Sequence, residues 1–310
     1  MAYNLKEVSL KPERLTGGHR MCAGCAAPVV VRGVLRALKE EDKAVITSAT
    51  GCLEVSTFLY PYTAWEDSFF HSAFENAGCN AGAIETAYRV LKKTGKLEDN
   101  YKFIAFGGDG GTYDIGLQSL SGAMERGHDM VYVCYDNGAY MNTGIQRSSA
   151  TPRYADTTTS PAGKVVNGKQ QGRKELTKVM AAHNLPYIAQ TAPFGNFKDL
   201  HEKAEKAIYT EGACFLNVLS PCPRGWRYET SKMMDLCKIA VETCFWPLYE
   251  IENDKYNITY MPKEKRPITD WIEAQGRFKH ILKNDEAIKV IQADVDAQWE
   301  ELQLLASLNK

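Results

Sequence analysis

Short apolar runs alternate with amphipathic stretches along most of this 310-residue chain. Runs rich in β-branched and aromatic residues predict buried strands at 45–49, 69–73, 101–106, 130–135, 187–190, 213–219 and, at a sheet edge, 248–251. Apolar positions at helical spacing predict helices at 26–40, 53–60, 75–93, 115–126, 174–183, 197–209 and 230–244. Strands that alternate with helices are typical of an α/β protein whose mostly parallel sheet is flanked by helices.

Three segments do not follow this alternation. Residues 1–20 are irregular and polar, and residues 147–172 form a long polar excursion without periodicity. Loops of that length inside a compact domain are usually functional or contact surfaces, and a disordered surface is the competing interpretation. From residue 252 the chain is polar, with a long helix at 285–307. We therefore predict an α/β domain at 1–251 and a C-terminal arm at 252–310 that packs on partner subunits rather than adding to the core.

The composition is that of an ordinary soluble protein, with 44% hydrophobic residues, 24% charged residues and a formal net charge of -1. This near-zero net charge gives no indication that the protein binds nucleic acid, or a membrane through a polybasic surface. No apolar run approaches the roughly 18 residues of a membrane span, and we see no secretion signal, so we expect a cytoplasmic protein. Nine cysteines, an odd number at irregular spacing, argue against a secreted disulfide framework.

Two polar turns follow neighbouring predicted strands. The strand at 101–106 runs into the glycine-rich turn 107–111, and the strand at 130–135 runs into the turn 136–143. Ligands in open α/β sheets lie at the carboxyl ends of strands, where these two turns are expected to be neighbours. Glycines allow the backbone to approach a diphosphate closely, and the N-terminus of the following helix favours its negative charge.

The same turns carry candidate metal ligands. Asp109 and Asn137 offer hard oxygens for Mg²⁺, which prefers one or two protein side chains together with phosphate oxygens, and the carbonyl of Ala139 would complete the octahedron. A Gly-Asp-Gly sequence after one strand and an Asn-containing turn after the next resemble the thiamine diphosphate motif. A glycine cluster alone would be weak evidence, but the two linked turns make this cofactor the favoured interpretation.

Four cysteines fall on loops at strand or helix ends. Cys22 and Cys25 form a Cys-x-x-Cys at a helix start, Cys52 lies in a Thr-Gly-Cys turn, and Cys222 lies between two prolines. Four thiolates in one place suit a [4Fe–4S] cluster or a structural zinc ion. Structural zinc usually takes two paired Cys-x-x-Cys knuckles, which are missing here, so the cluster fits better. The other five cysteines fall within predicted helices or strands, where small buried apolar residues are the simpler interpretation.

Several motifs in order over nearly the whole chain identify a family. The chain resembles the β subunit of the archaeal and bacterial pyruvate:ferredoxin oxidoreductases, within the 2-oxoacid:ferredoxin oxidoreductase family, from about residue 18 to the QGRFKH segment at 275–280. The most specific motifs are CAGC at 22–25, ATGC at 49–52, PYTAW at 61–65, AFENA at 73–77, GGDGGTYDIGLQSLSG at 107–122, YDNGAYMNTGIQRSSATP at 135–152 and CPRGW at 222–226.

The resemblance implies a role for each matching position. Asp109, Asn137 and the Ala139 carbonyl would hold Mg²⁺, while Asn142 and Thr50 are the catalytic candidates beside the thiazolium. The cluster ligands implied are Cys22, Cys25, Cys52 and Cys222. The cofactor-binding set implied is Thr50, Gly51, Cys52, Gly108, Asp109, Gly110, Gly111, Asn137, Ala139, Tyr140, Met141, Asn142 and Thr143.

The implied reaction is CoA-dependent oxidative decarboxylation of a 2-oxoacid, with pyruvate as the expected substrate and electrons passing through the [4Fe–4S] cluster to ferredoxin. The chain resembles only the diphosphate-binding half of a thiamine enzyme. An α subunit would supply the activating glutamate, and γ and ferredoxin-like δ subunits, or fusions of them, would complete the complex. The chain alone is therefore expected to be inactive.

Several alternatives remain open at this point. Related subunits act on branched-chain 2-oxoacids or on oxalate, and oxalate would leave no acyl group for CoA. A non-redox thiamine enzyme with a structural metal site would not need a four-cysteine cluster. A purely structural or electron-relay subunit would leave Asp109 and Asn137 without a function.

Overall fold

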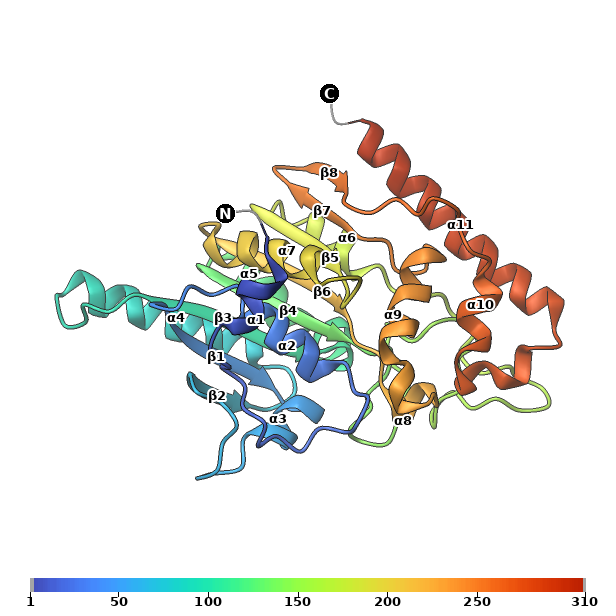
Figure 1. Ribbon diagram of the computed structural model, residues 1–310, viewed down its shortest axis with the longest axis horizontal. Helices are drawn as coiled ribbons and strands as arrows, with labels where there is room; N and C mark the ends of the chain where they lie inside the picture. The colour runs from blue at the N-terminus through green and yellow to red at the C-terminus, as the bar shows by residue number, and fades with distance from the viewer. Residues whose placement is uncertain (1–2, 309–310) are drawn as a thin grey trace.

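The computed structural model describes residues 3–308, and its centre is one eight-stranded sheet (Figure 1). The strand order is β2-β1-β3-β4-β6-β5-β7-β8. The first six strands in the chain pair in parallel, whereas β7 and β8 pair antiparallel, which confirms the mostly parallel α/β fold. The strands are β1 Lys43–Ala49, β2 Ser68–Ser72, β3 Tyr101–Gly108, β4 Met130–Asp136, β5 Tyr187–Thr191, β6 Ala213–Leu219, β7 Tyr249–Glu252 and β8 Lys255–Ile258.

The predicted helices lie close to their predicted positions, and the structure adds short helical elements that were not predicted, including α8, α10 and η3. A short helix occupies part of the irregular N-terminal segment, a π-helical turn precedes α5, and a 3-10 turn precedes α9. The helical elements are α1 Leu5–Leu10, α2 Ala27–Leu35, α3 Cys52–Thr57, α4 Ala77–Lys93, η1 Gly110–Asp114, α5 Leu117–Glu125, α6 Leu176–Ala181, α7 Lys198–Tyr209, α8 Pro223–Trp226, η2 Thr230–Lys232, α9 Met233–Glu242, α10 Ile268–Glu273, η3 Gly276–Ile281 and α11 Asp285–Ser307.

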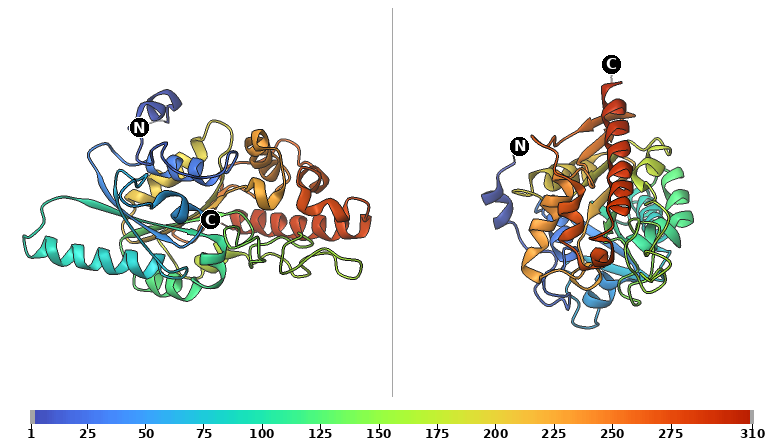
Figure 2. Two further views of the ribbon diagram at one scale, coloured as in Figure 1. Left: turned by 90° about the horizontal axis from the view of Figure 1, so that it is seen from below. Right: turned by 90° about the vertical axis from the view of Figure 1, so that its right-hand side faces the viewer.

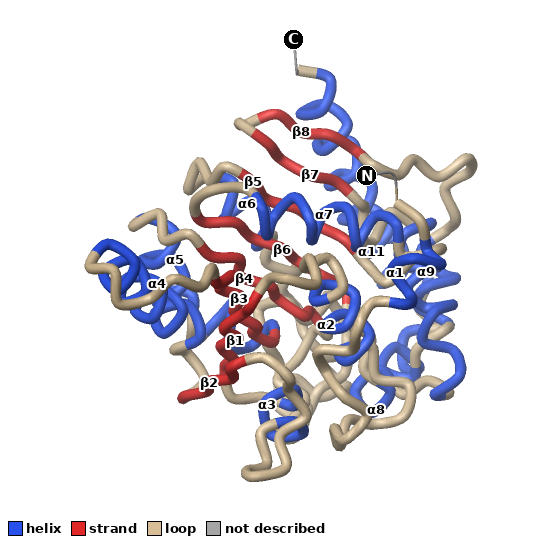
Figure 3. Tube along the Cα trace, turned by 60° about the vertical axis from the view of Figure 1, so that its left-hand side comes forward, coloured by secondary structure: helices blue, strands red, loops and turns tan. Residues whose placement is uncertain are grey.

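Helices cover both faces of the sheet because successive side chains of each strand point to opposite faces. In β4, Met130 and Tyr132 belong to the apolar cluster shared with α4 and α5. Val131 and Val133 belong to the second cluster, which includes α2 and α7. The fully buried β4 is therefore apolar on both sides, as expected for a central parallel strand. The strands form a single twisted sheet with helices on either side (Figure 3).

The strand order reverses between β1 and β3. The chain leaves β1 toward β2 on one flank, whereas it leaves β3 toward β4 on the other. Loops that diverge from the carboxyl ends of such neighbouring strands leave a crevice, which is where ligands bind in open α/β sheets. The two turns identified from the sequence, after β3 and after β4, lie at this end of the sheet.

The C-terminal residues do more than the predicted arm. Strand β7 is not an edge strand, because β8 pairs with its outer side. Beyond it, Trp271, Phe278 and Trp299 are buried in the same apolar cluster as α4, α5 and β4. The segment after residue 252 therefore adds to this chain's own core, since its polar sequence also carries a spaced row of large apolar residues. Its packing on partner subunits stays a prediction.

The polar excursion at 147–172 is packed against the rest of the chain and does not fit a disordered surface. Arg153 pairs with Asp294 of α11 at 2.7 Å, and Lys169 is 1% exposed. Figure 2 shows the segment running beside α11. Among the described helices, none is long and apolar enough to cross a membrane.

Candidate active site

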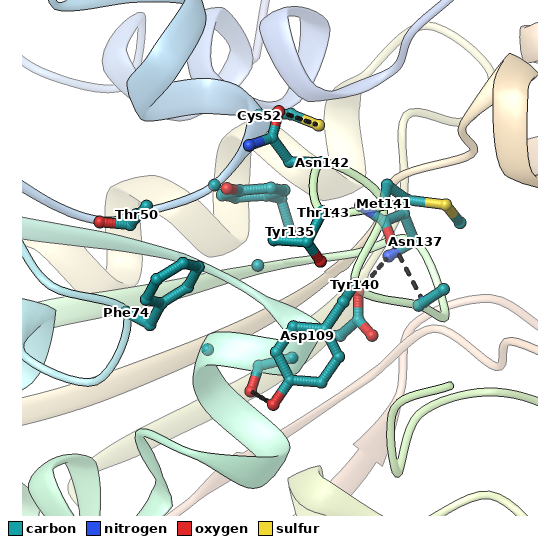
Figure 4. A pocket seen from close by; sticks show the side chains of 15 residues that line it. Thr50, Cys52, Phe74, Asp109, Tyr135, Asn137, Tyr140, Met141, Asn142 and Thr143 are labelled. Carbon is teal, nitrogen blue, oxygen red and sulfur yellow. Dashed lines mark hydrogen bonds between the residues drawn. The ribbon is translucent and has the colours of Figure 1, made fainter. Parts of the chain in front are cut away.

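One pocket at the carboxyl ends of β1, β3 and β4 contains every residue that the sequence assigned to cofactor binding (Figure 4). The space in and above it, open solvent included, is about 360 Å³. Phe74 and Tyr135 also line it and were not predicted. The lining residues are Thr50, Gly51, Cys52, Phe74, Gly108, Asp109, Gly110, Gly111, Tyr135, Asn137, Ala139, Tyr140, Met141, Asn142 and Thr143.

The turn after β1 forms one wall of the pocket. The hydroxyl of Thr50 donates a hydrogen bond to the Ser72 carbonyl at 3.0 Å, which ties the end of β1 to the end of β2. Gly51 follows, and a Cβ at this position would lie 2.9 Å from the hydroxyl of Tyr135. The absence of a side chain at Gly51 therefore allows β4 to approach the start of α3, where Cys52 faces the pocket.

The turn after β3 forms the floor. Asp109 is completely buried; its Oδ1 accepts from the backbone N–H of Asn137 at 3.2 Å, and its Oδ2 accepts from the hydroxyl of Ser148 at 2.5 Å. The hydroxyl of Tyr140 donates to the Gly110 carbonyl at 2.9 Å, and a Cβ on Gly110 would lie 2.4 Å from the Tyr140 ring. The glycine therefore lets the turns after β3 and β4 pack directly on each other.

The environment of Asp109 favours a bound cation. Burial, and then the nearby Asp136 carboxylate, raise the pKa of Asp109 to about 8, although the Ser148 hydroxyl and the Asn137 N–H oppose this shift. Arg173 pairs with Asp136 at 2.7 Å, which leaves Asp109 without a cation of its own at ion-pair distance among the described residues. A divalent cation would stabilise the ionised carboxylate, so Asp109 fits the proposed Mg²⁺ ligand.

The turn after β4 brings the remaining predicted ligands to the pocket. The Asn137 side chain accepts from the Ala139 N–H at 3.3 Å, which closes an Asx turn. Gly138 has a φ of 72°, in the left-handed region that favours glycine. The Asn137 carbonyl accepts from the Trp226 indole N–H at 2.6 Å. This bond connects the turn to the loop that carries Cys222.

The four predicted cluster cysteines converge beside the pocket. The Ala26 N–H donates to the Pro221 carbonyl at 3.1 Å, which joins the loop of Cys22 and Cys25 to the loop of Cys222. Burial, and then the charges of the other three thiols, raise the pKa of Cys25 to about 12, although a backbone hydrogen bond at Ala27 opposes the shift. Thiols that influence one another in this way require a positive group before all four become thiolates.

The side chains of these cysteines are near one another but are not arranged as metal ligands. Among residues 3–308, no group of three or more His, Cys, Asp or Glu side chains is arranged to hold a metal ion. Of the other cysteines, Cys79 is half-buried in α4 outside the pocket lining, where its thiol donates to the Asn76 carbonyl at 3.3 Å. The remaining four are buried: Cys134, Cys214, Cys237 and Cys244.

Asn142 and Cys52 meet at the end of the pocket opposite Asp109 and Tyr140 (Figure 4). The Cys52 thiol donates to the Asn142 amide oxygen at 3.8 Å. The thioether of Met141 points away from the pocket and packs where a Cβ on Gly225 would lie, 2.2 Å from the sulfur. The turn after β4 is therefore in contact with the loop of Cys52 and with the loop of Cys222.

Comparison with known proteins agrees with this geometry. Residues 49–218 match the family model described as thiamine pyrophosphate enzyme, C-terminal TPP binding domain. The chain is 46% identical over 320 residues to the pyruvate synthase subunit PorB of Thermotoga maritima, covering 100% of this chain and 98% of the relative. It is also 42% identical over 299 residues to the ketoisovalerate oxidoreductase subunit VorB of Pyrococcus abyssi, covering 96% of this chain and 94% of the relative.

A solved structure shares the fold. The 2-oxoglutarate:ferredoxin oxidoreductase from Magnetococcus marinus, solved with 2-oxoglutarate, coenzyme A and succinyl-CoA bound, aligns with a TM-score of 0.56 and 24% identity. The alignment covers 72% of this chain and 69% of the other. At this identity the likeness supports the arrangement of sheet and helices.

Proposed function

The chain belongs to the β subunits of the 2-oxoacid:ferredoxin oxidoreductases, a family of thiamine diphosphate enzymes, and we propose that it serves the oxidative decarboxylation of pyruvate to acetyl-CoA. One observation carries the proposal: the whole predicted cofactor set lines one pocket whose floor is the buried Asp109 carboxylate. The 46% identity to a pyruvate synthase subunit, over nearly the full length of both chains, supports the choice of pyruvate.

The pocket suits the cofactor and its metal. Asp109, Asn137 and the Ala139 carbonyl would hold Mg²⁺, while Gly110 and Gly111 leave the backbone open to the diphosphate. When bound, thiamine diphosphate supplies the carbanion that adds to the 2-oxoacid carbonyl and retains the electrons left by loss of CO₂. The Asn142 amide, at the Cys52 end of the pocket, would orient a substrate oxygen, and Thr50, whose hydroxyl is bonded to the Ser72 carbonyl, would hold the pocket wall.

We further propose that the four converging thiols hold a [4Fe–4S] cluster. Burial, and then the charges of the neighbouring thiols, raise the pKa values of the Cys25 and Cys52 thiols, and iron would supply the compensating positive charge. Since Cys52 lines the pocket and also belongs to the thiol group, electrons have a short path out of the active site toward ferredoxin. The other members of the thiol group are Cys22, Cys25 and Cys222.

The pocket of this chain lacks a glutamate that would activate the cofactor's pyrimidine, since Asp109 is the acidic residue that lines it within the described chain. We propose that an α subunit supplies this glutamate, as the family resemblance implies. The γ and ferredoxin-like δ subunits, or fusions of them, would complete a cytoplasmic complex. Activity is expected from the complex and not from this chain alone.

A branched-chain 2-oxoacid is the second candidate substrate. The 42% identity to a ketoisovalerate oxidoreductase subunit is close to the 46% identity to a pyruvate synthase subunit, so overall similarity separates the two substrates only weakly. Oxalate, oxidised without CoA, is the other variant of the same chemistry. The substrate-facing residues that this chain contributes, Thr50 and Asn142, do not discriminate among these acids by charge.

The test is an anaerobic viologen-reduction assay on the native complex, with pyruvate, 2-oxoisovalerate and oxalate, each with and without CoA. CoA-dependent reduction that is fastest with pyruvate is the expected result. A faster CoA-dependent rate with 2-oxoisovalerate, or CoA-independent reduction with oxalate, would contradict the choice of pyruvate. A complex carrying Asp109→Ala is the matched control, and it should lack bound thiamine diphosphate and reduce the dye with none of the acids; normal cofactor content in this variant would contradict the metal-binding role.

A further inference from the structure

The excursion at 147–172 contacts both cofactor turns through a single four-residue turn. The Ser148 hydroxyl donates to Asp109 Oδ2 at 2.5 Å. The Thr151 hydroxyl accepts from the Ser148 N–H at 2.9 Å and donates to the Gly138 carbonyl at 2.7 Å. Ser148 and Thr151 are both buried, so water does not compete for these bonds. The turn thus connects the turn after β3 to the turn after β4.

A buried lysine holds this turn from the far end of the excursion. Lys169 Nζ donates to the carbonyls of Ser149 at 3.1 Å, Thr151 at 2.5 Å and Gly172 at 3.1 Å. Three carbonyls satisfy the three donors of an ammonium group. Burial, and then the charges of nearby arginines, lower the pKa of Lys169 to about 7, although the nearby Asp114 carboxylate opposes this shift.

The Lys169 ammonium group has the structural role that a bound metal ion has in other loops. A cation surrounded by backbone carbonyls draws separate pieces of chain together, as Ca²⁺ does in its binding loops. Here two of the carbonyls belong to the turn that contacts Asp109 and Gly138, and the third belongs to the end of the excursion. The buried Lys169 ammonium group therefore joins the beginning of the excursion to its end.

We propose that Lys169, Ser148 and Thr151 form a positioning device that fixes Asp109 and the Gly138 turn at the separation that the cofactor's metal and diphosphate require. None of the three residues lines the pocket, so each acts through another group. The inference rests on the proposed role of Asp109 as a ligand of the cofactor's Mg²⁺. It gives the polar excursion a function that the sequence left open.

The first experiment replaces the Ser148 hydroxyl and measures binding of thiamine diphosphate and Mg²⁺ to the assembled complex by calorimetry. Ser148→Ala should weaken Mg²⁺ binding about tenfold or more, because a buried hydrogen bond to a charged group is lost. Ser148→Thr keeps a hydroxyl and should recover most of the affinity. Ser149→Ala is the matched control, because that neighbouring hydroxyl donates to Asp114 and not to Asp109.

The second experiment tests the internal cation. Lys169→Ala leaves three carbonyls facing an empty space, so added ammonium chloride at about pH 6.5 should restore cofactor affinity relative to tetramethylammonium chloride of equal ionic strength. Lys169→Met fills the same space with apolar atoms and should not be rescued. Equal responses of the two variants to ammonium would overturn the role of the charge.

The outcomes separate this inference from the proposed function. A wild-type complex that binds no thiamine diphosphate–Mg²⁺ would contradict the proposed function itself. A wild-type complex that binds them, together with Ser148→Ala that binds as tightly as wild type and Ser149→Ala, would overturn the positioning device alone. Ser148→Ala removes only one oxygen atom, and circular dichroism of each variant establishes that it has folded.

Discussion

Asp109 is a buried acid whose protonation is coupled to the stability of the cofactor-free protein. Its pKa is raised to about 8, while an unfolded aspartate has a pKa of about 3.9. Between these values the folded chain holds a proton that the unfolded chain has lost. The stabilising contribution of this group is therefore fully present below about pH 4 and is lost as the pH rises through about 8.

This coupling predicts the behaviour of Asp109→Asn, which mimics the neutral acid at every pH. Without Mg²⁺ and cofactor, the urea midpoint of Asp109→Asn minus that of the wild type should be larger at about pH 8.5 than at about pH 5.5. The reason is that only the wild type loses a stabilising proton at this position as the pH rises. With Mg²⁺ and thiamine diphosphate the order should reverse, since the ligands stabilise only the protein that binds them.

The control for this measurement is Asp235→Asn, an exposed carboxylate that pairs with Lys232 at 3.3 Å on the surface of the protein. Such a pair contributes about 1 kcal/mol or less. A midpoint difference between wild type and Asp109→Asn that stays the same at both pH values would contradict the raised pKa of Asp109.

Among single residues, the sequence predicted the site residues that directly follow a strand. It missed those whose contact with the site depends on how distant segments pack. Asp109, Asn137 and their neighbours follow strands directly, so the strand ends located them. Ser148 comes from a segment that has no periodicity, and its bond to Asp109 depends on how the whole excursion folds back. Phe74 and Tyr135 lie within recognised motifs, at 73–77 and 135–152, but the directions of their side chains depend on the sheet.

Among the elements, the π-helical turn at Gly110–Asp114 could not be inferred from periodicity. The Ile115 N–H bonds to the Gly110 carbonyl, five residues back, at 3.3 Å. A Cβ on Gly116 would lie 1.9 Å from the Gly111 carbonyl, so the turn depends on glycine at that position. A 3.6-residue period predicts an ordinary α-helix, and it placed the helix start at 115 instead of Leu117.

Helix α11 was predicted with its correct bounds, but the sequence did not predict that one of its faces packs on this chain's own core. Its buried residues recur about every four positions, a spacing typical of one helix face. An apolar face shows that a helix packs on something, but it does not show whether that surface belongs to the same chain. Here it is the chain's own core, where Trp299 is 8% exposed.

Trp299→Ala should therefore destabilise the isolated chain by about 3 to 5 kcal/mol, because it removes a large side chain from a packed cluster and leaves a cavity. Urea unfolding followed by circular dichroism measures the change. Leu304→Ala on the same helix is the control, since Leu304 is 60% exposed and should change stability by less than about 0.5 kcal/mol. Equal effects of the two substitutions would show that α11 contributes little to this chain's core.

For the whole molecule, the division at residue 252 does not separate two cores. Trp271 and Phe278 share one apolar cluster with β3, β4 and α5, so residues on both sides of this division contribute to one core. Burial of this kind depends on contacts between segments far apart in the chain. That is why composition along the sequence could not reveal it.

The two cofactor sites proposed for this molecule should be separable by mutation. Cys222→Ser in the assembled complex should lose iron but keep thiamine diphosphate, because Cys222 does not line the pocket. Cys52→Ser should reduce both, since Cys52 belongs to both sites. Iron analysis and cofactor extraction measure the two contents, and Cys237→Ala in α9 is the control. Full iron content in Cys222→Ser would contradict its assignment as a ligand.

The hydrogen bond between Ala26 and Pro221 also sets an order of events during synthesis of the protein. The thiols that it brings together, Cys22 and Cys222, are 200 residues apart in the sequence. At a ribosome speed of about 5 to 20 residues per second, the first waits roughly 10 to 40 s for the second to be made. During that interval Cys22 and Cys25 are an unshielded pair on a nascent chain, open to oxidation. Iron delivery to the proposed cluster is therefore expected after translation, and low oxygen tension during this interval would protect the two thiols.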